Sequence, residues 1–88
     1  METTNPSSPW YPYVWVDPER MSGTPCFRNS RLPVKSLFDH LAHGYTVEGF
    51  MDAFDGAPRD MVFGVLEVAA REFERSIAVP SNVGVRAA

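Results

Sequence analysis

The sequence predicts a mainly α-helical fold, namely a three-helix, helix-turn-helix-like (homeodomain-like) bundle preceded by a short N-terminal β-hairpin. Two observations lead to this prediction. Apolar residues recur at helical spacing in three segments after Pro33, whereas aromatic and β-branched residues crowd one short segment before it. The 88 residues suit one small domain with a thin margin of stability, because so short a chain buries only a modest share of its surface.

Composition divides the chain into three parts. Residues 1–9 are polar and include Pro6 and Pro9, so we expect a disordered N-terminus. Residues 10–76 carry the apolar periodicity and form the expected domain. Residues 77–88 alternate apolar and small residues without a helical period, and we expect a flexible C-terminal tail. This tail either frays or becomes ordered on a partner.

The hairpin is expected from a first strand over about residues 13–17 and a return strand over about residues 24–28. The segment 10–16 places aromatic or β-branched residues on both of its faces, and Pro12 restricts it to a sheet edge or to a start after that point. An apolar edge strand on a small domain needs cover. Either the helices cover it, or a second subunit pairs with it.

Three amphipathic helices follow. The first covers about residues 34–43 and ends at Gly44, the second begins after the N-cap Thr46 and ends at Asp55-Gly56, and Pro58 opens the third. The third helix has an apolar stripe of Val62, Val65, Leu66, Ala69, Ala70, Phe73 and Ile77. The expected core comprises Phe38, Leu41, Phe50, Phe54, Val62, Leu66 and Phe73.

The turn between the hairpin and the first helix, residues 23–34, is rich in residues that shape a backbone. Gly23, Pro25 and Pro33 restrict it, and Asn29 suits a left-handed position. One interpretation is a rigid connection. The other starts from the three cations in and beside the turn, since a stiff basic loop can bind phosphate or a carboxylate-lined partner. These cations are Arg28, Arg31 and Lys35.

Composition argues against several classes of function. The net charge of −3 argues against nucleic-acid binding through bulk charge. The single Cys26 excludes an intrachain disulfide, and His40 and His43 are best read as exposed side chains without a metal. No apolar run suits a membrane span or signal peptide, so we expect a cytoplasmic protein. We expect no enzyme activity and no cofactor.

The turn also carries a family resemblance. The run Gly23-Thr24-Pro25-Cys26-Phe27-Arg28-Asn29-Ser30-Arg31-Leu32-Pro33-Val34 resembles the signature "G-x-P-hydrophobic-hydrophobic-R-G-T-R-hydrophobic-P-V" of the bacterial antitoxin family known as domain of unknown function 433. The similarity covers roughly residues 14–73. Two departures are the Asn29-Ser30 pair, where the family has Gly-Thr, and Pro58, where it has a helix-starting Ser or Thr.

The resemblance implies a VapB-type, non-catalytic antitoxin of a type II toxin–antitoxin pair. Such proteins bind and neutralise a PIN-like ribonuclease toxin, and the resemblance extends to autoregulation through operator DNA. A homodimer or a larger toxin–antitoxin assembly is expected. The alternatives are a stand-alone helix-turn-helix transcriptional regulator and an orphan protein-interaction adaptor.

Candidate residues follow for each kind of contact. DNA would be bound by Arg28, Arg31 and Lys35 in the basic loop, with Arg59 at the start of the third helix. Self-association would use Trp10, Tyr13 and Trp15, or Met61, Phe63 and Val68, which lie off the apolar stripe of the third helix. The toxin would be bound by Arg71, Arg75 and Arg86, because a guanidinium matches the paired oxygens of an acidic nuclease site. The competing view is that the helical body blocks the toxin sterically.

Overall fold

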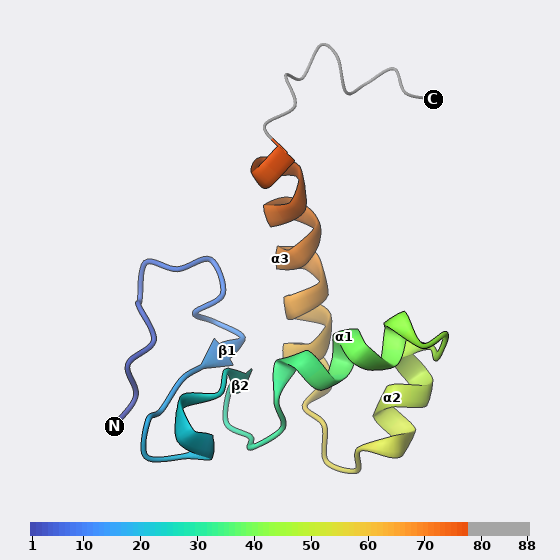
Figure 1. The fold of residues 1–88 in the computed structure, drawn as a ribbon, viewed down its shortest axis with the longest axis horizontal. Coiled ribbons are helices and arrows are strands. Elements are labelled where there is room, and N and C mark those ends of the chain that lie inside the picture. The colour runs from blue at the N-terminus through green and yellow to red at the C-terminus, as the bar shows by residue number, and fades with distance from the viewer. Residues whose placement is uncertain (78–88) are drawn as a thin grey trace.

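The computed structural model describes residues 1–77 and confirms the predicted fold class (Figure 1). Strands β1 (Val14–Trp15) and β2 (Cys26–Phe27) flank a short 3-10 turn, η1 (Met21–Gly23). The helices are α1 (Val34–Ala42), α2 (Val47–Ala53) and α3 (Arg59–Ile77). The last turns of α3 extend beyond the other elements (Figure 1). The expected flexible tail lies outside the described residues, except for Ile77.

The hairpin is shorter than expected. Val14 lies opposite Phe27 and Trp15 opposite Cys26 in an antiparallel pair. The ladder stops at Val16 because the N-terminal segment takes over its backbone groups. The Val16 amide donates to the Thr4 hydroxyl at 2.7 Å, and the Thr3 amide donates to the Val16 carbonyl at 2.8 Å. Residues 1–9 therefore lie along β1, which differs from the expected disorder. That expectation considered apolar burial alone, whereas these contacts are polar.

The turn after β2 has the expected left-handed residue. Asn29 has a φ of 67°, which confirms the prediction for this position. The turn folds back on itself, because the Ser30 amide and hydroxyl both donate to the Phe27 carbonyl, at 3.0 and 2.8 Å. The Phe27 amide in turn donates to the Leu32 carbonyl at 3.0 Å. These bonds fix the path from β2 into α1.

The helix boundaries follow the predicted signals closely. The Thr46 hydroxyl accepts a hydrogen bond from the Gly49 amide at 2.9 Å, which confirms the predicted N-cap of α2. Gly44 has a φ of 91° and ends α1 after His43, a conformation that glycine adopts without strain. The Pro58 carbonyl accepts the first helical bond of α3, from Val62 at 3.0 Å.

The core lies where the hairpin and the three helices meet, and its contents differ in part from the prediction. The cluster of buried residues consists of Val14, Phe27, Leu37, Phe50, Val62 and Val65. Phe50 and Val62 were expected there, while Leu41, Phe54 and Leu66 are only partly buried against it. The prediction was wrong for Phe38 and Phe73, which are 37% and 67% exposed.

The error for Phe73 comes from its position along α3. Val62, eleven residues earlier on nearly the same side of the helix, is fully buried, whereas Phe73 lies on the turns that extend past the core. The buried side chains of α3 are Val62, Val65 and Val68, so the rotation of the helix also buries Val68 from outside the predicted stripe. The stripe itself becomes exposed only from Ala70 onward. The first half of α3 is apolar around most of its circumference. Helical periodicity alone therefore does not decide which face is buried.

The contact that decides the rotation is between α3 and the residue before β1. A Cβ atom built on Gly64 would overlap with the ring of Tyr13, so the ring lies directly on the helix backbone. Gly64 is buried, and Tyr13 and Trp10 are packed against the core cluster. A glycine inside a helix costs stability, and here it provides the space for an aromatic ring.

We expect Gly64→Ala to lower the free energy of unfolding by about 1–3 kcal/mol, because the added methyl group displaces the Tyr13 ring. In a Tyr13→Ala background there is no ring for the added methyl group to displace. Gly64→Ala should then stabilise the protein by up to about 1 kcal/mol, because alanine has the higher helix propensity. Chemical denaturation of the four variants measures both effects. The same sign in both backgrounds would contradict the assigned contact.

At the turn, Asn29→Gly should be neutral or slightly stabilising, whereas Asn29→Val should cost about 1–2 kcal/mol, because a β-branched residue is strained at this positive φ. Thermal unfolding of the two variants tests the difference. Equal melting temperatures would argue against the left-handed assignment.

Candidate protein-interaction surfaces

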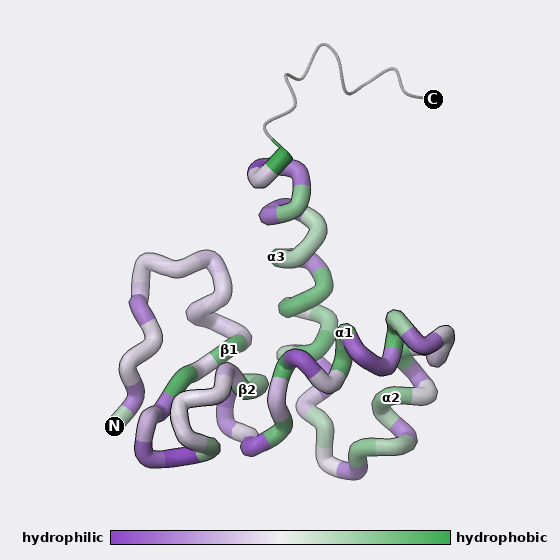
Figure 2. The backbone as a smooth tube through the Cα atoms, in the orientation of Figure 1, coloured by the Kyte–Doolittle hydropathy of each residue, from purple (hydrophilic) through white to green (hydrophobic). Residues whose placement is uncertain are grey.

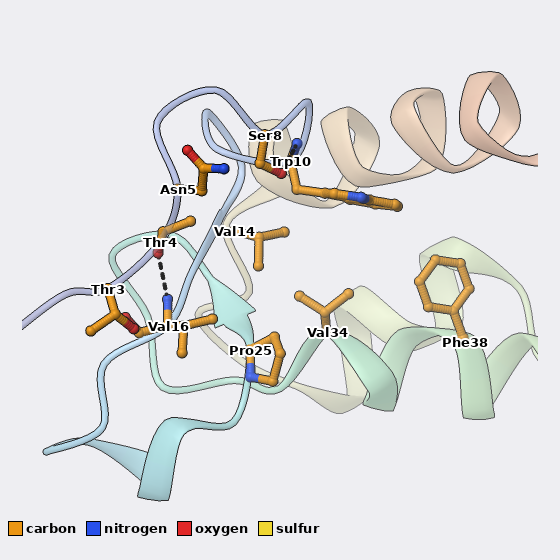
Figure 3. A pocket seen from close by; sticks show the side chains of 10 residues that line it. All are labelled: Thr3, Thr4, Asn5, Ser8, Trp10, Val14, Val16, Pro25, Val34 and Phe38. Carbon is orange, nitrogen blue, oxygen red and sulfur yellow. Dashed lines mark hydrogen bonds between the residues drawn. The ribbon is translucent and has the colours of Figure 1, made fainter. Parts of the chain in front are cut away.

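An apolar groove of about 470 Å³ opens between the N-terminal segment and α1. Figure 3 shows Trp10 on one side of this groove, and Val34 and Phe38 of α1 on the other. Val14 forms part of its apolar lining, and Thr4 lies at its polar end. The groove exists because residues 1–9 lie beside β1 without covering the outer side of α1.

Arg28, the first of the expected DNA-binding residues, is part of the fold itself. Its guanidinium donates two hydrogen bonds to the Glu2 carboxylate, at 2.6 and 3.1 Å. It also donates to the backbone carbonyls of Tyr11 and Val14, at 2.8 and 3.2 Å. The side chains of Arg28 and Glu2 are only 18% and 28% exposed. The expectation of a basic loop is therefore corrected for Arg28, because its charge is paired with a carboxylate that is distant in the sequence.

The ion pair shifts the pKa of both partners. Hydrogen bonds from Arg28 hold the pKa of Glu2 below its ordinary value of 4.5, and those to Glu2 raise the pKa of Arg28. The guanidinium carbon of Arg28 also lies 4.4 Å from the centre of the Tyr11 ring, within range of a cation–π contact. This arrangement pins the N-terminal segment to the hairpin.

The other expected DNA-binding cations are mostly paired as well. Lys35 lies 2.9 Å from a carboxylate oxygen of Asp39, and Arg59 lies 3.1 Å from one of Glu48. Arg31 is exposed and has no ion pair within residues 1–77. DNA binding stays a prediction, and of the expected loop only Arg31 offers an uncommitted charge.

The aromatic residues expected to self-associate are largely occupied by the chain itself. Trp10, Tyr13 and Trp15 are each half-buried. The Trp15 indole nitrogen donates to the Ser30 carbonyl at 2.9 Å, and Arg20 lies over its ring. Of the two alternatives for this segment, cover by the chain's own elements fits these contacts.

The three residues of α3 that were expected to self-associate differ in their exposure. Val68 is fully buried, and Met61 is half-buried against the core, so the expectation that both lie on an open surface is corrected. Phe63 is 39% exposed, with the Arg59 guanidinium 4.9 Å from its ring centre. The sequence placed Val68 off the buried face because the stripe through Leu66 and Phe73 is equally apolar.

An apolar stripe along the outer side of α3 is the surface that the sequence prediction missed. We call it the α3 seam and define it as Phe63, Leu66, Ala70, Phe73 and Ile77. Phe73 and Ile77 are 67% and 51% exposed, on turns that extend past the core. Figure 2 shows hydrophobic and hydrophilic residues alternating along these turns. The sequence did contain the signal, but Leu66 and Phe73 had been assigned to the core.

The expected toxin-binding arginines lie on a different side of α3. Arg71 and Arg75 are exposed, are one turn apart, and point away from the side that carries Phe73, as the helical repeat requires. Arg75 lies 3.3 Å from a carboxylate oxygen of Glu72. Arg86 lies outside the described residues.

The residues weighed for metal binding and nucleophilic chemistry have structural environments. Within residues 1–77, no group of at least three His, Cys, Asp or Glu side chains could hold a metal ion. His40 is half-buried among Tyr45, Phe50 and Phe54, with ring centres 4.7 to 5.6 Å away, which corrects its expected exposure. Burial raises the pKa of the Cys26 thiol, as for a packed rather than a reactive cysteine.

A family model described as "Protein of unknown function (DUF433)" matches residues 14–67, which is more than half of the chain. The chain belongs to the DUF433 family. The matched region spans the hairpin, α1, α2 and the first half of α3, and it ends before Phe73 and Ile77. No curated protein and no solved structure matched the chain. Within residues 1–77, no helix has the length and apolar character that a membrane crossing requires.

The Glu2–Arg28 pair makes stability depend on pH. Because the pKa of Glu2 is lowered in the folded protein, the pair stabilises the fold above the unfolded pKa of about 4.5, and this contribution is lost as pH falls through the folded pKa. Glu2→Gln should therefore lower the melting temperature at neutral pH and have progressively less effect below about pH 4.

Thermal unfolding of both proteins across this pH range tests the prediction. Glu74→Gln is the matched control, since Glu74 is exposed and has no ion pair among the described residues. A gap between wild type and Glu2→Gln that persists in acid would show that Glu2 acts through packing instead of charge.

Proposed function

We propose that this DUF433 protein is the antitoxin of a type II toxin–antitoxin pair, which binds and neutralises a PIN-like ribonuclease toxin in the cytoplasm. The observation that carries the proposal is the exposure of Phe73 and Ile77 on α3, beyond the core of the domain. The resemblance of the turn at residues 23–34 to the antitoxin family supplies the class of partner.

Exposed aromatic and branched side chains in a continuous stripe favour a protein partner. Single apolar residues on a surface are ordinary, but a contiguous apolar patch on a small domain marks an interaction site. Large side chains such as Phe73 supply most of the binding energy where they enter a pocket of a partner. The α3 seam lies on a single helix, so its side chains are presented in a regular row.

Charge supports a protein partner over nucleic acid. The chain has a net charge of −3, and Arg28, Lys35 and Arg59 each face a carboxylate. Affinity for DNA depends on cations that release counterions from phosphates, and cations already paired contribute less. Autoregulation through operator DNA therefore remains a secondary part of the proposal, with toxin binding as its centre.

The test is co-expression of the protein with the product of the adjacent reading frame. We expect the two to co-purify, and Phe73→Asp with Ile77→Asp to weaken binding by about 100-fold or more, because two buried anchors become charged. Tyr45→Asp is the matched control, since Tyr45 is 60% exposed in the turn between α1 and α2, away from the α3 seam. The variants at Phe73 and Ile77 should keep the melting temperature of the wild type, since both residues lie outside the core.

Deleting residues 80–88 in the same assay separates the two modes of neutralisation. Unchanged affinity would favour steric blocking by the helical body over an arginine threaded into the acidic site. If the adjacent product does not bind the wild-type protein at all, the antitoxin proposal is wrong, and the regulator or adaptor alternatives take its place.

A further inference from the structure

The α3 seam has the spacing of a coiled-coil helix. Its members, Phe63, Leu66, Ala70, Phe73 and Ile77, follow one another at alternate intervals of three and four residues, which is the a and d pattern of heptads. Over this distance the helix rises by about 21 Å. The buried residues Val65 and Val68 lie away from the seam, and Leu66 is partly buried against the core. The seam is therefore open to a partner mainly at Phe63, Ala70, Phe73 and Ile77.

One edge of this seam is acidic. Asp60, Glu67 and Glu74 recur every seven residues, and the helical repeat places them in a row beside Phe63, Ala70 and Ile77. All three carboxylates are exposed, and none takes part in an ion pair within the part of the chain that the structure describes. The opposite edge carries Ala69 and Ser76, which have no charge.

We propose that the α3 seam binds an amphipathic helix whose apolar face is bordered by a row of Lys or Arg residues. The apolar face would cover Phe63, Phe73 and Ile77, and the cations would face Glu67 and Glu74. This inference rests on the proposed function, because it places that helix on the toxin. Charge complementarity assigns the occupant, since pairing with a basic row turns three unpaired carboxylates into ion pairs.

A second copy of the chain fits this seam poorly. In an antiparallel pair, Glu67 would lie opposite Glu74 of the other copy, and like charges in such positions repel. In a parallel pair the acidic edge would face Ala69 and Ser76, with no attraction.

The test uses two synthetic peptides of about three heptads, with the same Leu and Ile residues at a and d. One has Lys at the flanking positions and the other has Glu. Fluorescence anisotropy with the full chain measures the affinity of each. We expect the Lys peptide to bind about tenfold more tightly at low salt, and the preference to shrink near 1 M NaCl.

Charge reversal on the protein gives the decisive comparison. Glu67→Lys with Glu74→Lys should invert the preference between the peptides. Asp52→Lys with Asp55→Lys is the matched control, because it changes the net charge equally on α2 and the turn after it, away from the seam. The control should leave the order of affinities intact, and Phe73→Asp should weaken both peptides.

Equal binding of the two peptides, or inversion by the control variant, would overturn the inference. So would light scattering that shows a dimer which Phe73→Asp dissociates, since a second copy would then occupy the seam. Toxin binding that withstands Glu67→Lys with Glu74→Lys would remove the inference and leave the antitoxin function. If charge reversal inverts the peptide preference but the chain does not bind the toxin, the assignment of the seam stands and the antitoxin function is wrong.

Discussion

The seating of the Tyr13 ring on the backbone of Gly64 is the constraint on which the rest of the arrangement depends. It joins the residue before β1 to the first half of α3, and so it brings together segments that are far apart in the sequence. Once the ring occupies this space, Val62, Val65 and Val68 face inward. From Ala70 onward the helix extends past this core, which is why the α3 seam is most exposed at Phe73 and Ile77.

Polar contacts of Arg28 also hold the N-terminal half of the chain together. Through one guanidinium, Arg28 joins the turn after β2 to Glu2 in the N-terminal segment and to the carbonyl groups of Tyr11 and Val14. A planar group with five donors suits such a junction, because it can satisfy several acceptors in fixed directions. Because Arg28 is used in this junction, its charge is not available on the surface. The remaining surface is acidic and apolar in character.

The sequence predicted the elements well because their signals are local. The Thr46 cap, the glycine after α1 and the left-handed Asn29 depend on neighbouring residues, and all three are confirmed. The prediction went wrong where distant residues decide. Nothing near Phe73 indicates that the core ends before it along α3, and nothing near Arg28 indicates that Glu2 pairs with it. The candidate surface was therefore missed although every residue of it was named.

The extension of α3 past the core affects the motions of the free protein. Its last turns are held by helical hydrogen bonds and by one exposed ion pair, Arg75 with Glu72, so little tertiary packing opposes their opening. These turns can unwind locally while the region around Gly64 stays folded. Amide hydrogens near Phe73 should consequently exchange with solvent much faster than those near Val65. A partner seated on the helix would slow that exchange and give up part of its binding energy to ordering the turns.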